Sequence, residues 1–423
     1  MNEPLDLSPL RANFPALQEK DEQGQPYVFF DGPGGTQVPQ QVITAMANYF
    51  IQANANRGGH YITSRRTDEM MSQARLAMAD FLNAPDPQEI VFGGNMTSLT
   101  YNLSRAIART WLQPGDEIVV TRLDHDANIS PWLALEEQGV NIQWADFDVE
   151  DCRLDMEHLA SLVTDQTKLI AVGYASNAVG TINPIGRIAA LARNVGAKLW
   201  VDAVHYAPHG PIDVQSLGCD FLVCSAYKFF GPHVGVLWGK YELLEELQAY
   251  QVRPASPKTP GKYETGTPNL EGIAGTLAAV DYLAEVGQTY GRQFAVELAR
   301  YEGRRQVLKQ AMKAIATYER ALFSNMLAQL QALPGLTVYG ITDPQEFAER
   351  GPTVAFTREG FTPRQIAQHL GRRGIFVWDG NYYALSVTQR LGLEDQGGMV
   401  RVGLAHYNTQ AEVDRLISAL REM

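Results

Sequence analysis

The sequence predicts an α/β protein with a large, mostly parallel sheet and a smaller α/β unit after it. Between about residues 90 and 240, short apolar runs alternate with segments of helical periodicity. This alternation is typical of crossover units that cover both faces of a parallel sheet. A chain of 423 residues is also too long for one simple core, so we expect a large and a small domain.

Seven apolar runs are the candidate strands of the large sheet. They are residues 89–92, 117–120, 141–144, 168–172, 198–202, 221–224 and 234–238. Segments between them, such as 188–194, have the apolar spacing of helices. Ligands bind at the carboxyl ends of the strands in such sheets, so the residues after these runs are the first candidates for a site.

The rest of the chain predicts the smaller unit. A charged helix is expected over 293–331, closed by Leu333-Pro334-Gly335. Further strands are expected at 336–339, 353–356 and 374–377, with helices starting near Thr362-Pro363 and at Thr409. We therefore expect a large domain over 26–290, a small domain over 291–423, and an N-terminal arm over 1–25 that belongs to the small domain.

Composition excludes several classes of function. The net charge is -12 and there is no run of Lys or Arg, which argues against partners such as nucleic acid or an anionic membrane surface. No apolar stretch reaches membrane-spanning length, and the polar start at Met1-Asn2-Glu3-Pro4 does not resemble a secretory signal, so we expect a cytoplasmic protein. Three cysteines without paired spacing predict neither a metal site nor a disulfide framework.

Two polar residues stand at the ends of neighbouring apolar runs. Asp202 ends the run 198–202, and Lys228 closely follows the run 221–224. Pyridoxal phosphate (PLP) chemistry needs such a pair, because a lysine forms the Schiff base and an aspartate keeps the pyridine nitrogen protonated. Taken alone, the pair is equally compatible with two strand-end polar residues that share no role.

Three further segments follow predicted strands. Residues 93–98 (Gly-Gly-Asn-Met-Thr-Ser) are expected to open a helix at Leu99, where backbone N–H groups and hydroxyls could hold a phosphate; an ordinary turn is the alternative. His125 could stack on a pyridine ring or be a surface histidine between two acids. Asn177 could bond a ring oxygen or a substrate carboxylate, or simply sit in a turn.

The order and spacing of six motifs resemble the class V aminotransferase superfamily and, within it, the cysteine desulfurases that serve iron–sulfur assembly. The resemblance covers nearly the whole chain. The motifs are His125-Asp126-Ala127-Asn128 with Pro131-Trp132, Ser176-Asn177 with Gly180-Thr181, Asp202 with Pro208-His209, Ser225 with Lys228 and Gly231-Pro232, Glu264-Thr265-Gly266-Thr267-Pro268-Asn269, and Arg401 with Tyr407-Asn408-Thr409. The resemblance implies the type I fold of PLP-dependent transferases, with a mostly parallel seven-stranded sheet in the large domain.

The resemblance also implies roles for individual residues. Lys228 would form the Schiff base and transfer protons, Asp202 would pair with the pyridine nitrogen, and His125 would stack on the ring. Arg401 would clamp the substrate α-carboxylate with help from Asn177, and Arg57 lies in the segment that lines the entrance in relatives. The other implied cofactor contacts are Met96, Thr97, Asn177, Val204, His205, Ser225, Tyr227 and Thr267. Thr267 matches a threonine that reaches a neighbouring subunit's phosphate, so a homodimer with shared active sites is implied.

Some positions depart from the family pattern. Val204, His205 and Tyr227 stand where the family usually has alanine, glutamine and histidine. The loop over 378–384 lacks the cysteine whose thiolate attacks the substrate sulfur in desulfurases. The aromatic residues of this loop point to a larger pocket than cysteine needs.

These departures shape the expected function. The expected activity is C–S bond cleavage of cysteine or a related L-amino acid, and the missing loop cysteine favours a lyase over persulfide transfer. The alternatives are an aminotransferase or epimerase for another amino acid, or a protein of this fold that has lost catalysis.

Overall fold

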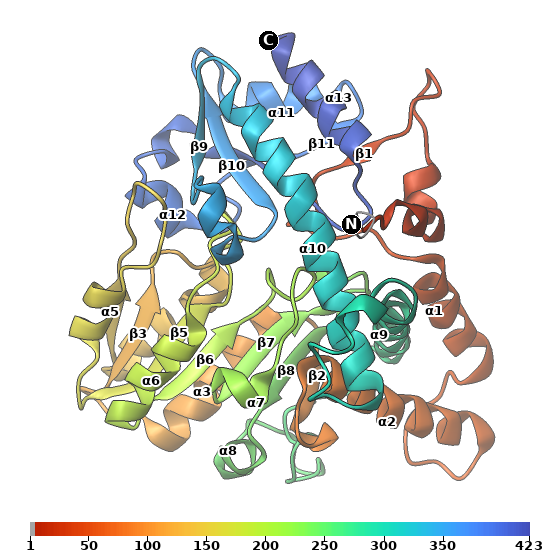
Figure 1. The fold of residues 1–423 in the computed structure, drawn as a ribbon. Coiled ribbons are helices and arrows are strands. Elements are labelled where there is room, and N and C mark those ends of the chain that lie inside the picture. The colour runs from red at the N-terminus through yellow and green to blue at the C-terminus, as the bar shows by residue number, and fades with distance from the viewer. Residues whose placement is uncertain (1–4) are drawn as a thin grey trace.

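In the computed structural model, which describes residues 5–423, the chain is built around a seven-stranded sheet (Figure 1). The strand order is β2-β8-β7-β6-β5-β3-β4, and only β8 runs antiparallel to its neighbours. All seven predicted runs are strands, so the mostly parallel sheet is confirmed. Their bounds are β2 Ile90–Gly93, β3 Glu117–Thr121, β4 Asn141–Ala145, β5 Thr167–Gly173, β6 Lys198–Asp202, β7 Phe221–Ser225 and β8 Gly235–Gly239.

Both faces of this sheet are buried, and its central strands β5, β6 and β7 are largely apolar. Leu199 and Leu222 pack on the face covered by α2 (Ile62–Leu82) and α6 (Ile185–Val195), while the adjacent Trp200 and Val223 pack on the opposite face, against α3 (Met96–Trp111). Burial on both faces is what a parallel sheet between helices requires.

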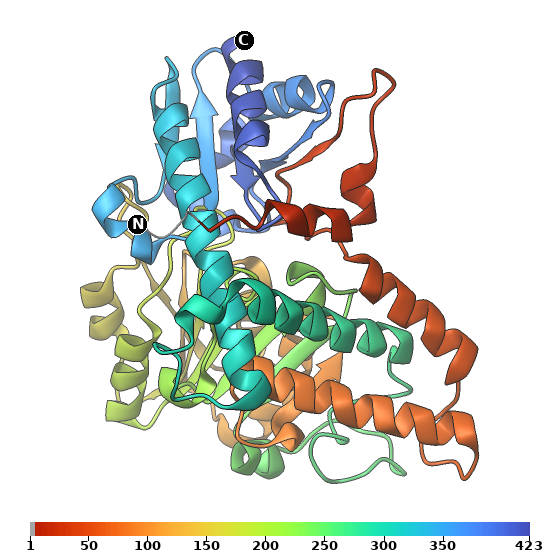
Figure 2. The same cartoon turned by 45° about the vertical axis from the view of Figure 1, so that its right-hand side comes forward.

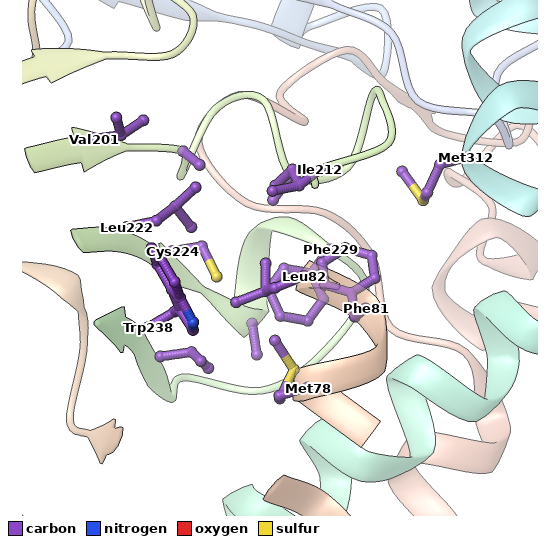
Figure 3. Packing of buried hydrophobic residues seen from close by; sticks show 14 of the residues in the cluster. Met78, Phe81, Leu82, Val201, Ile212, Leu222, Cys224, Phe229, Trp238 and Met312 are labelled. Carbon is purple, nitrogen blue, oxygen red and sulfur yellow. The ribbon is translucent and has the colours of Figure 1, made fainter. Parts of the chain in front are cut away.

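Figure 3 shows part of the first of these cores. Side chains of α2, among them Phe81 and Leu82, lie beside Leu222 and Cys224 of β7. Cys224 is fully buried there, as is Cys219 just before the strand, so both cysteines are part of the core.

The C-terminal unit is built on a four-stranded antiparallel sheet in the order β12-β13-β10-β9. Its core is made by side chains of the sheet, of the second half of α10 and of the two helices α11 and α13. The bounds are β9 Leu336–Tyr339, β10 Thr353–Arg358, α11 Pro363–Gly371, β12 Trp378–Gly380, β13 Met399–Gly403 and α13 Gln410–Arg421. Capping boxes at Thr362 and Thr409 start the two helices.

The N-terminal segment lies against the C-terminal unit, as Figure 2 shows. Arg11 forms an ion pair of 2.9 Å with Glu412, and β1 (Val28–Phe29) pairs in parallel with β11 (Ile375–Phe376). Val28 and Phe30 also belong to the core of that unit, although the sequence prediction begins the large domain at residue 26. Residues 1–4 of the predicted arm lie outside the described residues, and the domain division itself stays a prediction.

Three element boundaries differ from the sequence prediction. Helix α10 (Gly303–Gln331) begins ten residues later than expected. Gly303 has a left-handed φ of 55°, which prevents the helix from extending further toward the N-terminus. Helix α3 begins at Met96 rather than Leu99, since the side chain of Asn95 accepts the Ser98 N–H and caps it. Residues 378–380 form β12, although they were expected in a loop.

Helix α10 joins the two units. The first half of α10 packs on α9 (Leu270–Tyr290) and α2, and its second half enters the core of the C-terminal unit. Figure 2 shows α10 running from one unit to the other. Within residues 5–423, no helix combines the length and the apolar character that crossing a membrane requires.

Candidate functional site

A cavity of about 1190 Å³ lies where the strands of the large sheet end. Asp202, the last residue of β6, and Lys228, in the turn after β7, both line it. Because β6 and β7 pair in parallel, their carboxyl ends bring these two side chains to the same edge of the sheet. Both side chains are buried, so the structure brings the predicted lysine and aspartate together in one enclosed place.

Burial moves both groups toward neutrality. It lowers the pKa of Lys228 to about 7, and the positive charge of Arg401 acts in the same direction while Asp202 opposes it. Burial raises the pKa of Asp202 to about 7, although the Val204 N–H donates to its Oδ1 at 2.8 Å. A buried carboxylate with one oxygen so engaged suits a cationic N–H partner, which is what a protonated pyridine nitrogen presents.

The start of α3 forms one wall of the cavity. Met96 and Thr97, at its first turn, line the cavity, and the Met96 N–H donates to Ser225 Oγ at 3.0 Å. Ser225 is buried directly behind this turn. Free N–H groups at a helix start, beside hydroxyls, are a ready site for a phosphate group.

His125 lines the cavity and is half-buried, so it is not a surface histidine. The Ala127 N–H donates to its Nδ1 at 3.0 Å, which leaves the proton of the neutral ring on Nε2. Burial, together with the positive charges of Lys228 and Arg401, lowers the pKa of His125 to about 4. The ring is therefore neutral near pH 7 and a donor at Nε2.

Arg401 and Asn177 form a polar corner of the cavity. The Arg401 Nη1 donates to the backbone oxygen of Asn177 at 2.7 Å, and the Asn177 Nδ2 donates to the backbone oxygen of Tyr382 at 3.0 Å. Within the described residues, the buried Nε of Arg401 and Oδ1 of Asn177 have no hydrogen-bond partner. Burial lowers the pKa of Arg401 to about 10, so the guanidinium stays charged at neutral pH. Its Nε–H remains free to donate a hydrogen bond to a ligand. A carboxylate would satisfy that donor.

Three more of the predicted contacts, Val204, His205 and Tyr227, line the same cavity. The Nε2 of His205 lies 3.1 Å from the Thr353 hydroxyl, and burial holds its pKa well below the usual range. Tyr227 stacks on His233 with ring centroids 5.0 Å apart. Tyr227, which departs from the family pattern described above, thus forms part of the cavity wall.

Three predicted residues do not line this cavity: Ser225, which is buried behind the Met96 turn, Arg57 and Thr267. Arg57 lies on the surface and pairs with Asp68 at 3.3 Å. Thr267 is exposed, shortly before α9. Their expected roles, at the entrance and at a neighbouring subunit's phosphate, stay predictions.

Sequence reasoning missed two buried carboxylates near the site. Asp124 lines the cavity and accepts the Gly173 N–H and the Asn128 amide; burial raises its pKa to about 6. Asp31 comes directly after the short apolar run that contains β1; burial raises its pKa to about 6, while Arg401 and Lys228 attract its charge. The available signal was a carboxylate directly after one apolar run, Asp31, and another shortly after the run 117–120, Asp124.

No cysteine among the described residues lines the cavity. Cys152, Cys219 and Cys224 are each fully buried elsewhere. Burial raises the pKa of the Cys152 and Cys219 thiols to about 12 and that of Cys224 in the same direction. Such thiols are not nucleophiles at neutral pH.

Known proteins match this chain over nearly its whole length. The family model of the class-V aminotransferases matches residues 28–305 and 301–416. A cysteine desulfurase of Yersinia pestis is 33% identical over 100% of this chain and 99% of its own length. A cysteine desulfurase of Synechococcus elongatus is 35% identical over 99% of this chain, which spans only 64% of that relative's length.

Solved structures of the same kind share the fold. A crystal structure of a cysteine desulfurase from Escherichia coli has a TM-score of 0.81 at 28% identity, covering 99% of this chain and 98% of that chain. The apo structure of a cysteine desulfurase from Thermococcus onnurineus has a TM-score of 0.84 at 24% identity, covering 100% and 99%. The type I fold expected from the sequence motifs is therefore confirmed.

Proposed function

This chain belongs to the class-V aminotransferase family, in the branch that contains the cysteine desulfurases, and we propose that it is a PLP-dependent enzyme that cleaves the C–S bond of L-cysteine or a related amino acid. The class-V aminotransferases and the cysteine desulfurases are PLP-dependent families. The observation that carries the proposal is the meeting of Lys228, Asp202 and Arg401 in one buried cavity.

The residues of the cavity fit the cofactor. The Thr97 hydroxyl and the free N–H groups at the first turn of α3 would hold its phosphate, with Ser225 supporting that turn through the Met96 N–H, and Asp202 would accept from its pyridine nitrogen. Asn177, Val204, His205 and Tyr227 would line the ring, with His125 stacked on one face. The fit is supported by the unpartnered Asn177 Oδ1, which can accept one more hydrogen bond in the cavity.

The chain's own residues supply binding and proton transfer. When bound, PLP supplies an electron sink that stabilises negative charge at the substrate Cα. Lys228, with a pKa near 7, is suited to accept the Cα proton at neutral pH. Arg401 would bind the α-carboxylate and so orient the Cα hydrogen toward Lys228. The Nε2–H of His125 can donate to the sulfur as it leaves.

The reaction is proposed as an elimination, in which the sulfur departs without an enzyme thiol. No thiol among the described residues lines the cavity, so a persulfide on this chain's own site is not part of the proposal. The relatives named above are cysteine desulfurases, and therefore they do not favour the alternative of an aminotransferase or epimerase. A catalytically inactive protein is disfavoured by the intact lysine, aspartate and arginine.

The proposal includes a homodimer with shared active sites. Thr267 is exposed and outside this protomer's cavity, as a contact to a partner's phosphate requires. Large apolar side chains are also exposed around the end of α1 (Gln40–Gln52) and the start of α2. Among them, Phe50 is 53% exposed and Ile51 78% exposed. Contiguous apolar residues of this kind mark an interaction surface.

Absorbance spectroscopy and product analysis test the proposal together. We expect the purified protein to show the visible band of bound PLP, and Lys228→Ala to lose it. With L-cysteine, elimination would release pyruvate and sulfide, whereas desulfuration would release alanine. Absence of the band after reconstitution with PLP would refute the cofactor assignment. Amino transfer to a keto acid would support the alternative of an aminotransferase.

A further inference from the structure

The cavity is larger than a small amino acid requires. Its volume of about 1190 Å³ lies above the range of roughly 300–1,000 Å³ for sites that hold drug-sized ligands. It extends from Lys228 outward to Arg364 and to the turn at residues 394–398. A cofactor and a three-carbon amino acid would occupy the inner part next to Lys228, so the outer part is free for a further group.

The pairing of strands β12 and β13 determines which side chains form one wall of the outer part. Trp378 of β12 and Arg401 of β13 are directly opposite each other in an antiparallel pair. Opposed residues in such a pair point to the same face of the sheet, and both of these side chains line the cavity. A substrate whose carboxylate is bound by Arg401 therefore continues beside the indole of Trp378. The indole is 51% exposed, so its surface is available to a ligand.

A second aromatic side chain that lines the cavity is carried by a strained loop. Tyr382 and Tyr383 have φ values of 56° and 59°, a left-handed conformation that costs side-chain-bearing residues about 1–3 kcal/mol each. The Asp126 N–H, donating to the backbone oxygen of Tyr383 at 2.7 Å, helps to hold the loop in place. Tyr383 stacks on His125 with ring centroids 5.7 Å apart, yet 75% of it is exposed.

The outer part of the cavity is negatively charged. Asp126, Asp379, Glu394 and Asp395 line it, and the one cation beside them, Arg364, lies 3.8 Å from Asp379. Four carboxylates against one guanidinium repel an anionic group and tolerate a neutral or cationic one. The positive charges of Lys228 and Arg401 are confined to the inner part.

From these observations we infer that the substrate is an S-substituted L-cysteine whose sulfur carries a bulky group without negative charge, bound by Trp378 and Tyr383. The inference rests on the proposed C–S cleavage and names its substrate class. It also accounts for the lack of a thiol at the site, because the sulfur leaves on its own substituent and needs no acceptor on the enzyme.

The reaction is balanced without an oxidant or reductant. The Cα–H bond breaks and its proton passes to Lys228. The Cβ–S bond then breaks, its electron pair leaves with the sulfur, and the thiolate takes up a proton. The 2-aminoacrylate that is released tautomerises and reacts with water. One S-substituted cysteine and one water thus give one thiol, one pyruvate and one ammonium ion.

A substrate series measures the selectivity. Pyruvate formation by the PLP-loaded enzyme is compared for L-cysteine and its S-benzyl, S-(2-aminoethyl) and S-carboxymethyl derivatives. We expect kcat/KM for S-benzyl-L-cysteine to exceed that for L-cysteine by about tenfold or more. The aminoethyl derivative should also be cleaved faster than the carboxymethyl derivative, since only the latter adds a negative charge.

Binding without turnover isolates the role of Trp378. In the Lys228→Ala background, calorimetry gives the Kd of S-benzyl- and S-methyl-L-cysteine. Adding Trp378→Ala should reduce the preference for the benzyl derivative by about tenfold. Tyr250→Ala is the matched control, because Tyr250 is an aromatic residue exposed to 52% that does not line the cavity.

The outcomes distinguish failure of this inference from failure of the proposed function. Cleavage of L-cysteine with no cleavage of the S-benzyl derivative would overturn this inference and leave the proposed function standing. Equal loss of preference in the Trp378 and Tyr250 variants would also overturn it. If no cysteine derivative is cleaved, the proposed function is wrong and the inference falls with it.

Discussion

The ring of Tyr382 covers the guanidinium of Arg401, with 4.3 Å between the guanidinium carbon and the ring centroid. The phenol donates to the backbone oxygen of Met399, two residues before Arg401 on β13. Tyr382 therefore fixes both the strand that carries the arginine and the orientation of its charged group. This contact explains why the chain accepts a left-handed conformation at a tyrosine.

Replacing Tyr382 tests this contact. Tyr382→Ala removes the ring from Arg401, and a desolvated cation–π contact is worth about 2 kcal/mol. We expect KM for the amino-acid substrate to rise about tenfold or more while kcat changes much less, because Arg401 binds the carboxylate in both the ground and the transition state. Tyr382→Phe keeps the ring but loses the hydrogen bond to Met399, so its KM should lie between those of wild type and Tyr382→Ala. A fall in kcat at constant KM would contradict the assignment.

Two variants of His125 should separate its proposed roles in ring stacking and in hydrogen-bond donation. His125→Phe keeps a flat ring but loses the donor at Nε2, so we expect retention of the cofactor with a loss of kcat of about a hundredfold. His125→Gln keeps an N–H donor but loses the ring, and weaker cofactor binding should be its main defect. Cofactor titration and steady-state kinetics on both variants check this. Identical defects in the two variants would argue against the separation.

The Ser225 hydroxyl supports the predicted phosphate site through the Met96 N–H. Ser225→Ala leaves that buried N–H without its acceptor and so disturbs the turn proposed to hold the phosphate. We expect the Kd for PLP to rise about tenfold, because a buried donor left without a partner costs about 1–3 kcal/mol. Fluorescence titration of the apo protein measures it. Ser98→Ala is the control. Ser98 lies on the same turn of α3 as Met96, but its side chain is exposed and its hydroxyl donates to Asn95.

Features set by local pattern could be predicted from the sequence. The seven large-sheet strands are mostly apolar runs, and Asp202 and Lys228 stand at the end of one of them and shortly after another. The helix starts at Thr362 and Thr409 were also expected, because capping residues act within one turn. The cytoplasmic location expected from the composition stays a prediction.

Features set by long-range pairing could not be predicted. Strand β12 contains only Trp378, Asp379 and Gly380, a poor strand sequence, and it forms because β13 offers it an edge. The position of Asp31 near Lys228 likewise depends on the N-terminal segment, which lies against the C-terminal unit. The stacking of Tyr382 on Arg401 needs a left-handed backbone that no tyrosine pattern indicates.

Disrupting the exposed apolar residues of α1 tests the dimer. Ile51→Glu places a charge on a side chain that is 78% exposed in the single chain. If this surface is the dimer contact, we expect the variant to be monomeric by light scattering and to lose activity, since Thr267 would no longer reach a partner's site. Val296→Glu is the control, because Val296 is 91% exposed and lies outside α1 and α2. An Ile51 variant that remains dimeric would exclude this surface.

Lys309 should make the stability of the protein depend on pH above neutrality. It is fully buried on α10, where its ammonium donates to the backbone oxygens of Phe81 and Ile212. Burial lowers its pKa from 10.5 to about 7. Below pH 7 the lysine is protonated in both the folded and the unfolded chain and contributes no slope. Between pH 7 and pH 10.5 the unfolded chain binds more protons, so the free energy of unfolding rises with pH.

Comparing wild type with Lys309→Met isolates this contribution, because other groups that titrate in the same range cancel in the difference. We expect the free energy of unfolding of wild type, relative to the variant, to rise with pH by at most about 1.4 kcal/mol per pH unit across that window. Denaturant titrations at several pH values measure it. Lys313→Met is the control on the same helix, since Lys313 is partly exposed and pairs with Glu297 at 2.8 Å. A difference between wild type and Lys309→Met that is constant with pH would mean that the buried lysine stays protonated throughout.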